Sequence, residues 1–247
     1  MNVALFLPCY VDQFYPQVGI ATLQLLEKLG CRVTFPIDQT CCGQPMANSG
    51  FEKLAQGCND LFIRNFGGNF DAIVCPSGSC TLHIREHLHS PAHEAQAADL
   101  RSRTYELTEF LTDVLKVTEL PGVRFPYRVG LHQSCHGQRG LHLSQMSELV
   151  APPFSKPERL LRMVDGLELI DLDRRDECCG FGGTFCVFEE AVSARMGIDR
   201  VDDHVRNGAE ILTGGDMSCL MHLEGIVRRR KLPVRVVHLA EILNGAV

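Results

Sequence analysis

The sequence predicts an α/β fold made of two similar half-domains, each built around a parallel sheet. Three observations carry this prediction. Short apolar runs of strand length alternate with helical patterns along the 247 residues, which is typical of parallel α/β units. The triplet Cys-Cys-Gly occurs twice, at 41–43 and 178–180. A single cysteine lies well upstream and another well downstream of each triplet, so the second half is expected to repeat the first.

The first half contains three predicted strands, at residues 2–7, 31–35 and 71–74. Helical patterns alternate with them, at 18–29, at 49–66 and over most of 81–115. Gly30 is expected to end the first helix. Ser49 and Glu52 have the spacing of a capping box at the start of the second.

The second half contains four predicted strands, at residues 127–131, 167–172, 209–213 and 233–237. Helices are expected at 157–164, at 184–206, after Cys219 and at 238–243. Both halves end on similar sequences, at 107–111 and 239–243. Pro121 and Gly122 mark the best candidate linker, which predicts half-domains at 1–122 and 123–247.

The two halves align through an upstream cysteine, a vicinal pair and a downstream cysteine. The aligned residues are Cys9 with Cys135, Cys41 and Cys42 with Cys178 and Cys179, and Cys80 with Cys219. The offsets of 126, 137 and 139 residues differ only by loop-sized insertions, so an approximate twofold relation between the halves is expected. Each cysteine site follows a predicted strand, and ligands of parallel sheets gather beyond the carboxyl ends of the strands. We therefore expect four thiols to converge in each half.

Composition narrows the class of protein. The net charge of −6 argues against a nucleic-acid binder. No purely apolar run approaches the roughly 20 residues that a membrane-spanning helix needs, and the first residues lack the basic leader of a signal peptide. The chain has twelve cysteines, and cysteine clusters in a reducing compartment are more often metal ligands or redox thiols than disulfides. A cytoplasmic location is expected.

Four thiolates in each half suit a tetrahedral zinc ion or an iron–sulfur cluster. Zinc sites favour cysteines two to four residues apart, whereas vicinal cysteines can more readily serve different iron atoms of a larger cluster. The pattern therefore favours iron–sulfur over zinc. Glycines beside the vicinal pairs would let backbone N–H groups approach the cofactor; they are Gly43, Gly180, Gly182 and Gly183.

Other candidates lie close to the two cysteine sets. Cys75 and Cys186 are either additional ligands or small buried thiols. His136 is the first candidate for a general base that removes a hydroxy-acid proton, with an outer contact to the cofactor as the alternative. Arg139 has the chemistry to clamp a carboxylate through two hydrogen bonds.

Five segments resemble one known family: Pro76–Cys80, Cys41-Cys42-Gly43-Gln44-Pro45, Ser134-Cys135-His136, the run from Cys178 to Phe185, and Cys219-Leu220-Met221. They are similar to the motifs of the cysteine-rich CCG domain family. That domain occurs twice in tandem in one of the subunits of heterodisulfide reductase and in the iron–sulfur subunit of glycolate oxidase. The resemblance runs from the first strand to the final 239–243 segment.

The resemblance implies one or two [4Fe-4S] clusters held by the eight aligned cysteines. It also implies an iron–sulfur subunit of a three-part, flavin-independent system that oxidises L-lactate. Its partners would be a larger iron–sulfur subunit with ferredoxin-like motifs and a third small subunit, and the electron acceptor stays open.

This sequence departs from the family motif at one position in each half. The motif ends in Cys-x-x-Cys, but the corresponding segments here begin with Ser77 and Asp216. Each half therefore has four family cysteines instead of five, which favours an ordinary [4Fe-4S] cluster over the unusual cluster found in heterodisulfide reductase. Asp216 is expected either to form a turn or to supply an oxygen ligand.

Two alternatives stay open. One is a thiol–disulfide oxidoreductase like heterodisulfide reductase, in which a vicinal pair is free of metal and reactive. The other is a zinc-stabilised assembly module without enzymatic activity, in which the cysteines contribute only folding energy.

Overall fold

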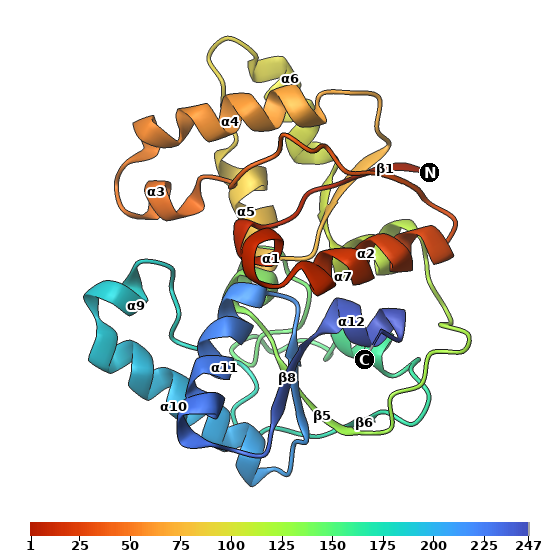
Figure 1. Cartoon of the computed structure of the whole chain (residues 1–247), viewed down its shortest axis with the longest axis vertical. Helices are drawn as coiled ribbons and strands as arrows, with labels where there is room; N and C mark the ends of the chain where they lie inside the picture. Colours follow the sequence, from red (N-terminus) through yellow and green to blue (C-terminus); the bar gives the residue numbers. More distant parts are fainter. Residues whose placement is uncertain (247) are drawn as a thin grey trace.

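Each half of the chain forms a four-stranded parallel sheet with helices around it (Figure 1). The computed structural model describes residues 1–246. The first sheet has the strand order β2-β1-β3-β4, made of β1 (Asn2–Leu5), β2 (Arg32–Thr34), β3 (Ala72–Cys75) and β4 (Thr104–Glu106). The second has the order β6-β5-β7-β8, made of β5 (Arg128–His132), β6 (Glu168–Leu169), β7 (Ile211–Gly214) and β8 (Arg235–His238). The predicted α/β fold with two similar halves is therefore confirmed.

The helices follow the strands in a corresponding order. Those of the first half are α1 (Cys9–Phe14), α2 (Pro16–Lys28), α3 (Gln44–Asn48), α4 (Glu52–Phe66), α5 (Gly78–His87), α6 (Glu94–Ser102) and α7 (Leu107–Glu109), which continues into the π-helical turn η1 (Phe110–Val114). Those of the second half are the π-helical turn η2 (His136–Gly140), α8 (Lys156–Leu161), α9 (Phe185–Phe188), α10 (Glu190–Arg206), α11 (Met217–Arg230) and α12 (Leu239–Asn244).

Strand register shows the duplication residue by residue. Val3 of β1 pairs with Ala72 of β3, and Val129 of β5 pairs with Ile211 of β7. These pairs are related by the offsets of 126 and 139 residues that align the outer cysteines. The loops beyond the strands therefore start from equivalent positions in the two sheets.

The central strands are buried on both faces. Every residue of β3 and of β7 is buried, and both strands are mainly apolar, as expected for parallel strands covered by helices on each side. The side chains of these strands form cores beneath the loops that carry the cysteines.

The two halves exchange their last helices. α12 of the second half packs against α2 of the first (Figure 1). α7 of the first half packs against α8 of the second. Lys28 Nζ of α2 donates to Asn244 O and Oδ1 of α12, both at 2.8 Å. A hydrophobic cluster with Leu25 and Leu243 among its members joins the two halves. This reciprocal packing fixes the halves relative to each other, as an approximate twofold axis requires.

One strand lies where the sequence pattern favoured helix. Residues 104–106 form β4 inside the stretch 81–115. Both of its buried residues, Thr104 and Glu106, are polar, so the strand lacks the apolar signature that marks the others.

Three helix predictions were wrong in detail. Ser49 does not cap α4, because it ends α3 and its Oγ donates to Pro45 O at 2.8 Å. α4 begins only at Glu52, without a side-chain cap. The stretch 184–206 is divided, because Glu189 adopts φ −121° and ψ 48° between α9 and α10. The short helices α1 and α3 were not predicted.

Within residues 1–246, none of the helices combines the length and apolar character needed to cross a bilayer. The linker around Gly122, which has φ +77°, lies between η1 and β5. The exact division at residue 122 stays a prediction.

Candidate metal centre

The first cysteine set gathers beyond the carboxyl ends of the first sheet. Cys9 begins α1 after β1, the vicinal pair lies in the loop after β2, and Cys80 lies in the first turn of α5 after β3. Cys9 Sγ is 3.9 Å from Cys41 Sγ, and Cys42 Sγ is 3.5 Å from Cys80 Sγ. The structure therefore brings the four thiols of the first half together, as the sequence predicted.

The second set gathers at the equivalent edge of the second sheet. Cys135 precedes η2 after β5, Cys178 and Cys179 follow β6, and Cys219 lies in the first turn of α11 after β7. The sulfur atoms of Cys179 and Cys219 lie within 4.8 Å of each other, and Cys135 and Cys178 are close enough for each thiol to shift the pKa of the other. The pairing repeats that of the first set, in which Cys9 lies beside Cys41 and Cys42 lies beside Cys80.

Glycines shape the loop beside each vicinal pair. Gly43 and Gly180 have φ +91° and +86°, in the left-handed region where a side chain is strained. The N–H of Gly43 donates to Cys41 Sγ and that of Gly180 to Cys178 Sγ, both at 3.4 Å. A Cβ on Gly180 would also lie 2.7 Å from Ser193 O. These glycines therefore let the backbone turn onto the sulfur atoms.

Each set already favours one thiolate. Hydrogen bonds from Cys42 and from Cys9 lower the pKa of Cys41 to about 2. In the second set, hydrogen bonds from Cys135 and from Cys179 lower the pKa of Cys178 to about 2. The same hydrogen bonds raise the pKa of the thiols that donate them, which are Cys9, Cys42, Cys135 and Cys179. The hydrogen bonds therefore place the negative charge of each set on the first cysteine of its vicinal pair, and metal binding would require deprotonation of the other thiols as well.

The two sets open onto one cavity of about 220 Å³ between the halves. All eight aligned cysteines line it. Other lining residues come from both halves and include Tyr10, Gln44, His136 and Phe181. The sequence predicted two sites but not that they share a cavity.

Ser77 and Asp216 occupy the positions where the family motif has a further cysteine. Ser77 Oγ accepts from the N–H of Cys80 at the start of α5, and Asp216 Oδ1 accepts from the N–H of Ser218 at the start of α11. The two residues also pair with each other in an antiparallel bridge. Asp216 Oδ2 accepts from the N–H of Ser79 at 2.8 Å. Both residues cap a cysteine-bearing helix and join the halves, so Asp216 has the turn-forming role among those expected.

The remaining candidates differ in their relation to the cavity. His136 lines it, with Nδ1 4.0 Å from Cys135 Sγ. Arg139 is not among the lining residues and pairs with Glu148. Cys75 is fully buried in β3, and Cys186 Sγ donates to Gly183 O at 3.1 Å. The alignment of β3 with β7 places Gly214 opposite Cys75, so this thiol belongs to the strand core.

His132 lies close to the second set and was not proposed as a ligand from the sequence. It is the last residue of β5, its side chain is buried, and neither ring nitrogen has a hydrogen-bond partner. Ligand atoms of His132, Cys179 and Cys219 lie within 4.8 Å of one another. Aligning β5 with β1 would have found it, because the offset of 126 places this polar residue opposite Phe6.

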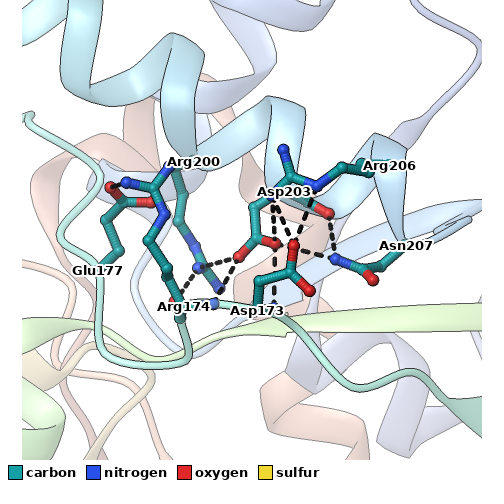
Figure 2. A network of polar contacts seen from close by, with 7 residues as sticks. All are labelled: Asp173, Arg174, Glu177, Arg200, Asp203, Arg206 and Asn207. Carbon is teal, nitrogen blue, oxygen red and sulfur yellow. Dashed lines mark hydrogen bonds and ion pairs between the residues drawn. The ribbon is translucent and has the colours of Figure 1, made fainter.

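A buried ionic network holds the loop that precedes Cys178 (Figure 2). Asp203 of α10 accepts the backbone N–H groups of Asp173 and Arg174, both at 3.1 Å. Arg200 Nη1 bonds to Asp203 Oδ2 at 3.1 Å and to Arg174 O. Both side chains of this pair are fully buried. The loop is therefore tied to α10 a few residues before the vicinal cysteines.

The residues present fit a metal group in both sets. Each offers four sulfur atoms, at least one backbone N–H donated to sulfur, and walls of closely packed side chains. Four thiolates are the donor set of zinc and of iron–sulfur clusters. The second set also has the unpartnered imidazole of His132.

Comparisons with known proteins identify a family for the chain. The chain matches the CCG cysteine-rich domain family over residues 3–85 and again over 129–224. It is 42% identical over 251 residues to lactate utilization protein A of an Exiguobacterium species, covering 100% of this chain and 98% of that protein. It is 43% identical to lactate utilization protein A of Geobacillus kaustophilus, covering 99% of each.

A solved structure supports the fold. A crystal structure of a hypothetical protein from Helicobacter pylori matches 98% of this chain with a TM-score of 0.60 at 12% identity. This chain spans 48% of that protein. The duplicated family match and the full-length relatives together show that the chain belongs to the CCG cysteine-rich domain family.

Proposed function

We propose that this chain is the iron–sulfur subunit of a multi-component oxidoreductase that converts L-lactate to pyruvate and passes the electrons onward. The observation that carries the proposal is the opening of two four-cysteine sets onto one cavity. The names of its full-length relatives supply the connection to lactate utilization. Membership of the CCG family supports metal binding by the duplicated cysteines.

In this proposal two [4Fe-4S] clusters are held by the two aligned sets, Cys9, Cys41, Cys42 and Cys80 in the first and Cys135, Cys178, Cys179 and Cys219 in the second. When bound, each cluster supplies one-electron transfer. Gly43, Gly180, Gly182 and Gly183 would turn the backbone so that its N–H groups face the sulfur atoms. Vicinal cysteines favour clusters over zinc, which prefers more widely spaced pairs.

In this proposal the clusters take up the part of the shared cavity lined by the cysteines, and lactate approaches them through its open side. Oxidation of lactate to pyruvate releases two electrons and two protons, and two one-electron centres match the two electrons. His136 lines this cavity and would accept the hydroxyl proton as general base. The hydrogen of the broken Cα–H bond would leave as the second proton to solvent at the mouth of the cavity, and its electron pair would pass as single electrons to the two centres. Phe181 and Tyr10, whose rings pack edge to face with centroids 5.9 Å apart, would exclude water from one side.

Partner subunits would dock around the mouth of the cavity. Two equivalent segments beside the cavity-lining loops carry exposed apolar side chains, namely Phe51 and Leu54 in the first half and Val187, Phe188 and Val192 in the second. Such paired apolar groups are typical of interaction surfaces. We propose that they meet the larger iron–sulfur subunit with ferredoxin-like motifs, and that a third small subunit completes the system. Twelve free thiols support a reducing, cytoplasmic setting.

The test is reconstitution under anaerobic conditions with the two partner proteins and an artificial electron acceptor. We expect L-lactate-dependent reduction only when all three proteins are present, and little reduction with D-lactate. Omission of this chain is the matched control. An unchanged rate in its absence would contradict the proposal, as would equal use of an unrelated alcohol.

A further inference from the structure

The two cysteine sets are alike, but the side chains behind them are not. Strand register aligns Phe6, just after β1, with His132 at the end of β5. Helices α4 and α10 align through the glycine after each vicinal pair. Gly43 lies against Ala55 and Cys58 of α4, and Gly180 lies against Ser193 and Met196 of α10. Ser193 and Met196 each lie 138 residues after their counterparts in α4, so an offset of 138 aligns the two helices.

Behind the first set these aligned positions are aromatic. The ring centroid of Phe6 lies 5.1 Å from that of Phe62 and 5.5 Å from that of Phe66. The rings of Phe62 and Phe66 are stacked at 4.5 Å. All three side chains are buried, so the first set has an apolar wall at these positions. The amide Nδ2 of Asn65, which lines a small pocket with Phe6 and Cys41, is a buried donor without a partner beside this wall.

Behind the second set the same three positions are polar. The offsets place His132, Arg200 and His204 opposite the three phenylalanines, and all three are buried. The neighbouring strand makes room for His204. A Cβ at Gly130 of β5 would lie 2.2 Å from His204 Nδ1, so only glycine fits there, whereas the aligned residue of β1 is Ala4. The two halves therefore differ at several packed positions behind the cysteines, and not by one substitution alone.

His132 is the member that reaches the cysteines. Its ring nitrogens have no hydrogen-bond partner, and its ligand atom lies within 4.8 Å of the sulfur atoms of Cys179 and Cys219. A buried N–H without a partner is costly, and sulfur at this position would satisfy it. Phe6 offers no such donor to the first set.

Hydrogen bonds to sulfur and the polarity of the surroundings set the reduction potential of an iron–sulfur centre. Reduction adds a negative charge, which an N–H donor and a polar wall stabilise and an apolar wall does not. The charge of Arg200 is partly offset by Asp203. His83 and His222 occupy aligned positions in the two halves, so they do not distinguish the sets. The difference therefore rests mainly on His132.

We infer that His132 donates a hydrogen bond to sulfur of the second centre and gives that centre the higher reduction potential of the two. This inference rests on the proposed iron–sulfur function. A single electron then passes from the first centre, which is oxidised, to the second, which is reduced, and no proton moves. The second half is the side from which electrons leave the cavity.

The test is a potentiometric titration followed by electron paramagnetic resonance on anaerobically purified protein. Cys80→Ala, which removes a ligand of the first centre only, assigns the signals. In the wild type the higher midpoint belongs to the second centre. The His132→Phe variant is poised at the potential where half of the second centre is reduced in the wild type. There the ratio of reduced to oxidised second centre should fall about ten-fold, which corresponds to a midpoint lowered by about 59 mV for a one-electron couple. The first centre does not change.

Two variants control for packing. His204→Phe makes the same side-chain change at a buried histidine outside the group formed by His132 and the two cysteines. In this variant the ratio of reduced to oxidised centre, measured at the wild-type midpoint, should stay within about two-fold of the wild-type ratio for both centres. His132→Asn keeps an N–H donor. Its second centre should recover at least half of the change in the logarithm of the reduced-to-oxidised ratio that His132→Phe causes.

The outcomes separate this inference from the proposed function. An unchanged second midpoint in a His132→Phe protein with full iron would overturn the inference and leave the function standing. Loss of half the iron in His132→Asn and His132→Phe alike would also overturn it, because His132 would then be a ligand. Absence of iron and sulfide from the wild type would overturn the function itself.

Discussion

Replacing Asp203 by alanine is expected to destabilise the protein by about 3–5 kcal/mol, because it leaves the Arg200 guanidinium buried without its carboxylate. Both side chains are fully buried and 3.1 Å apart. The same substitution removes the acceptor of two backbone N–H groups in the loop before Cys178 (Figure 2). Chemical denaturation of the metal-free protein, followed by circular dichroism, measures the loss.

Asp202→Ala is the matched control on the same helix. Asp202 pairs with Arg230 at 2.6 Å, but both side chains are more than a third exposed, and such surface pairs contribute about 0–1 kcal/mol. If Asp203→Ala cost no more than Asp202→Ala, the buried network would not be what holds the cysteine loop to α10.

Replacing Cys219 by alanine is expected to lower the bound iron from about eight to about four atoms per chain, because the second set loses one of four ligands. Lactate-dependent electron transfer in the reconstituted system should fall at least about 100-fold, the upper end of what the loss of an outer partner of a metal site costs. Metal analysis and the anaerobic assay measure the two effects.

Cys186→Ala controls for the loss of a thiol near the same set. Cys186 donates to Gly183 O and is not among the residues that line the cavity, so iron and rate should stay within about two-fold of the wild type. Full iron and full rate in Cys219→Ala would rule out the second set as a cluster site.

The duplication and the convergence of the cysteines were predictable because both depend on local patterns. Apolar strands, the glycine beside each vicinal pair and constant offsets all lie in short segments of the chain. β4 was missed because its buried residues, Thr104 and Glu106, are polar. The similarity of 107–111 to 239–243 offered a signal, since the latter segment follows a predicted strand.

The shared cavity and the different walls of the two sets depend on long-range packing. The exchange of α7 and α12 between the halves brings the sites together, and no local pattern marks which half a short helix will join. His132 gave no signal in a search for ligand motifs. It becomes visible only when the strands are aligned and an aromatic residue is found opposite it.

The measurement that tests the central claim most directly is the content of iron, acid-labile sulfide and zinc in protein purified without oxygen. About eight iron and eight sulfide per chain are expected, as both cysteine sets would hold [4Fe-4S] clusters. Stoichiometric zinc without sulfide, persisting after anaerobic reconstitution with iron and sulfide, would contradict the account and favour a zinc-stabilised module.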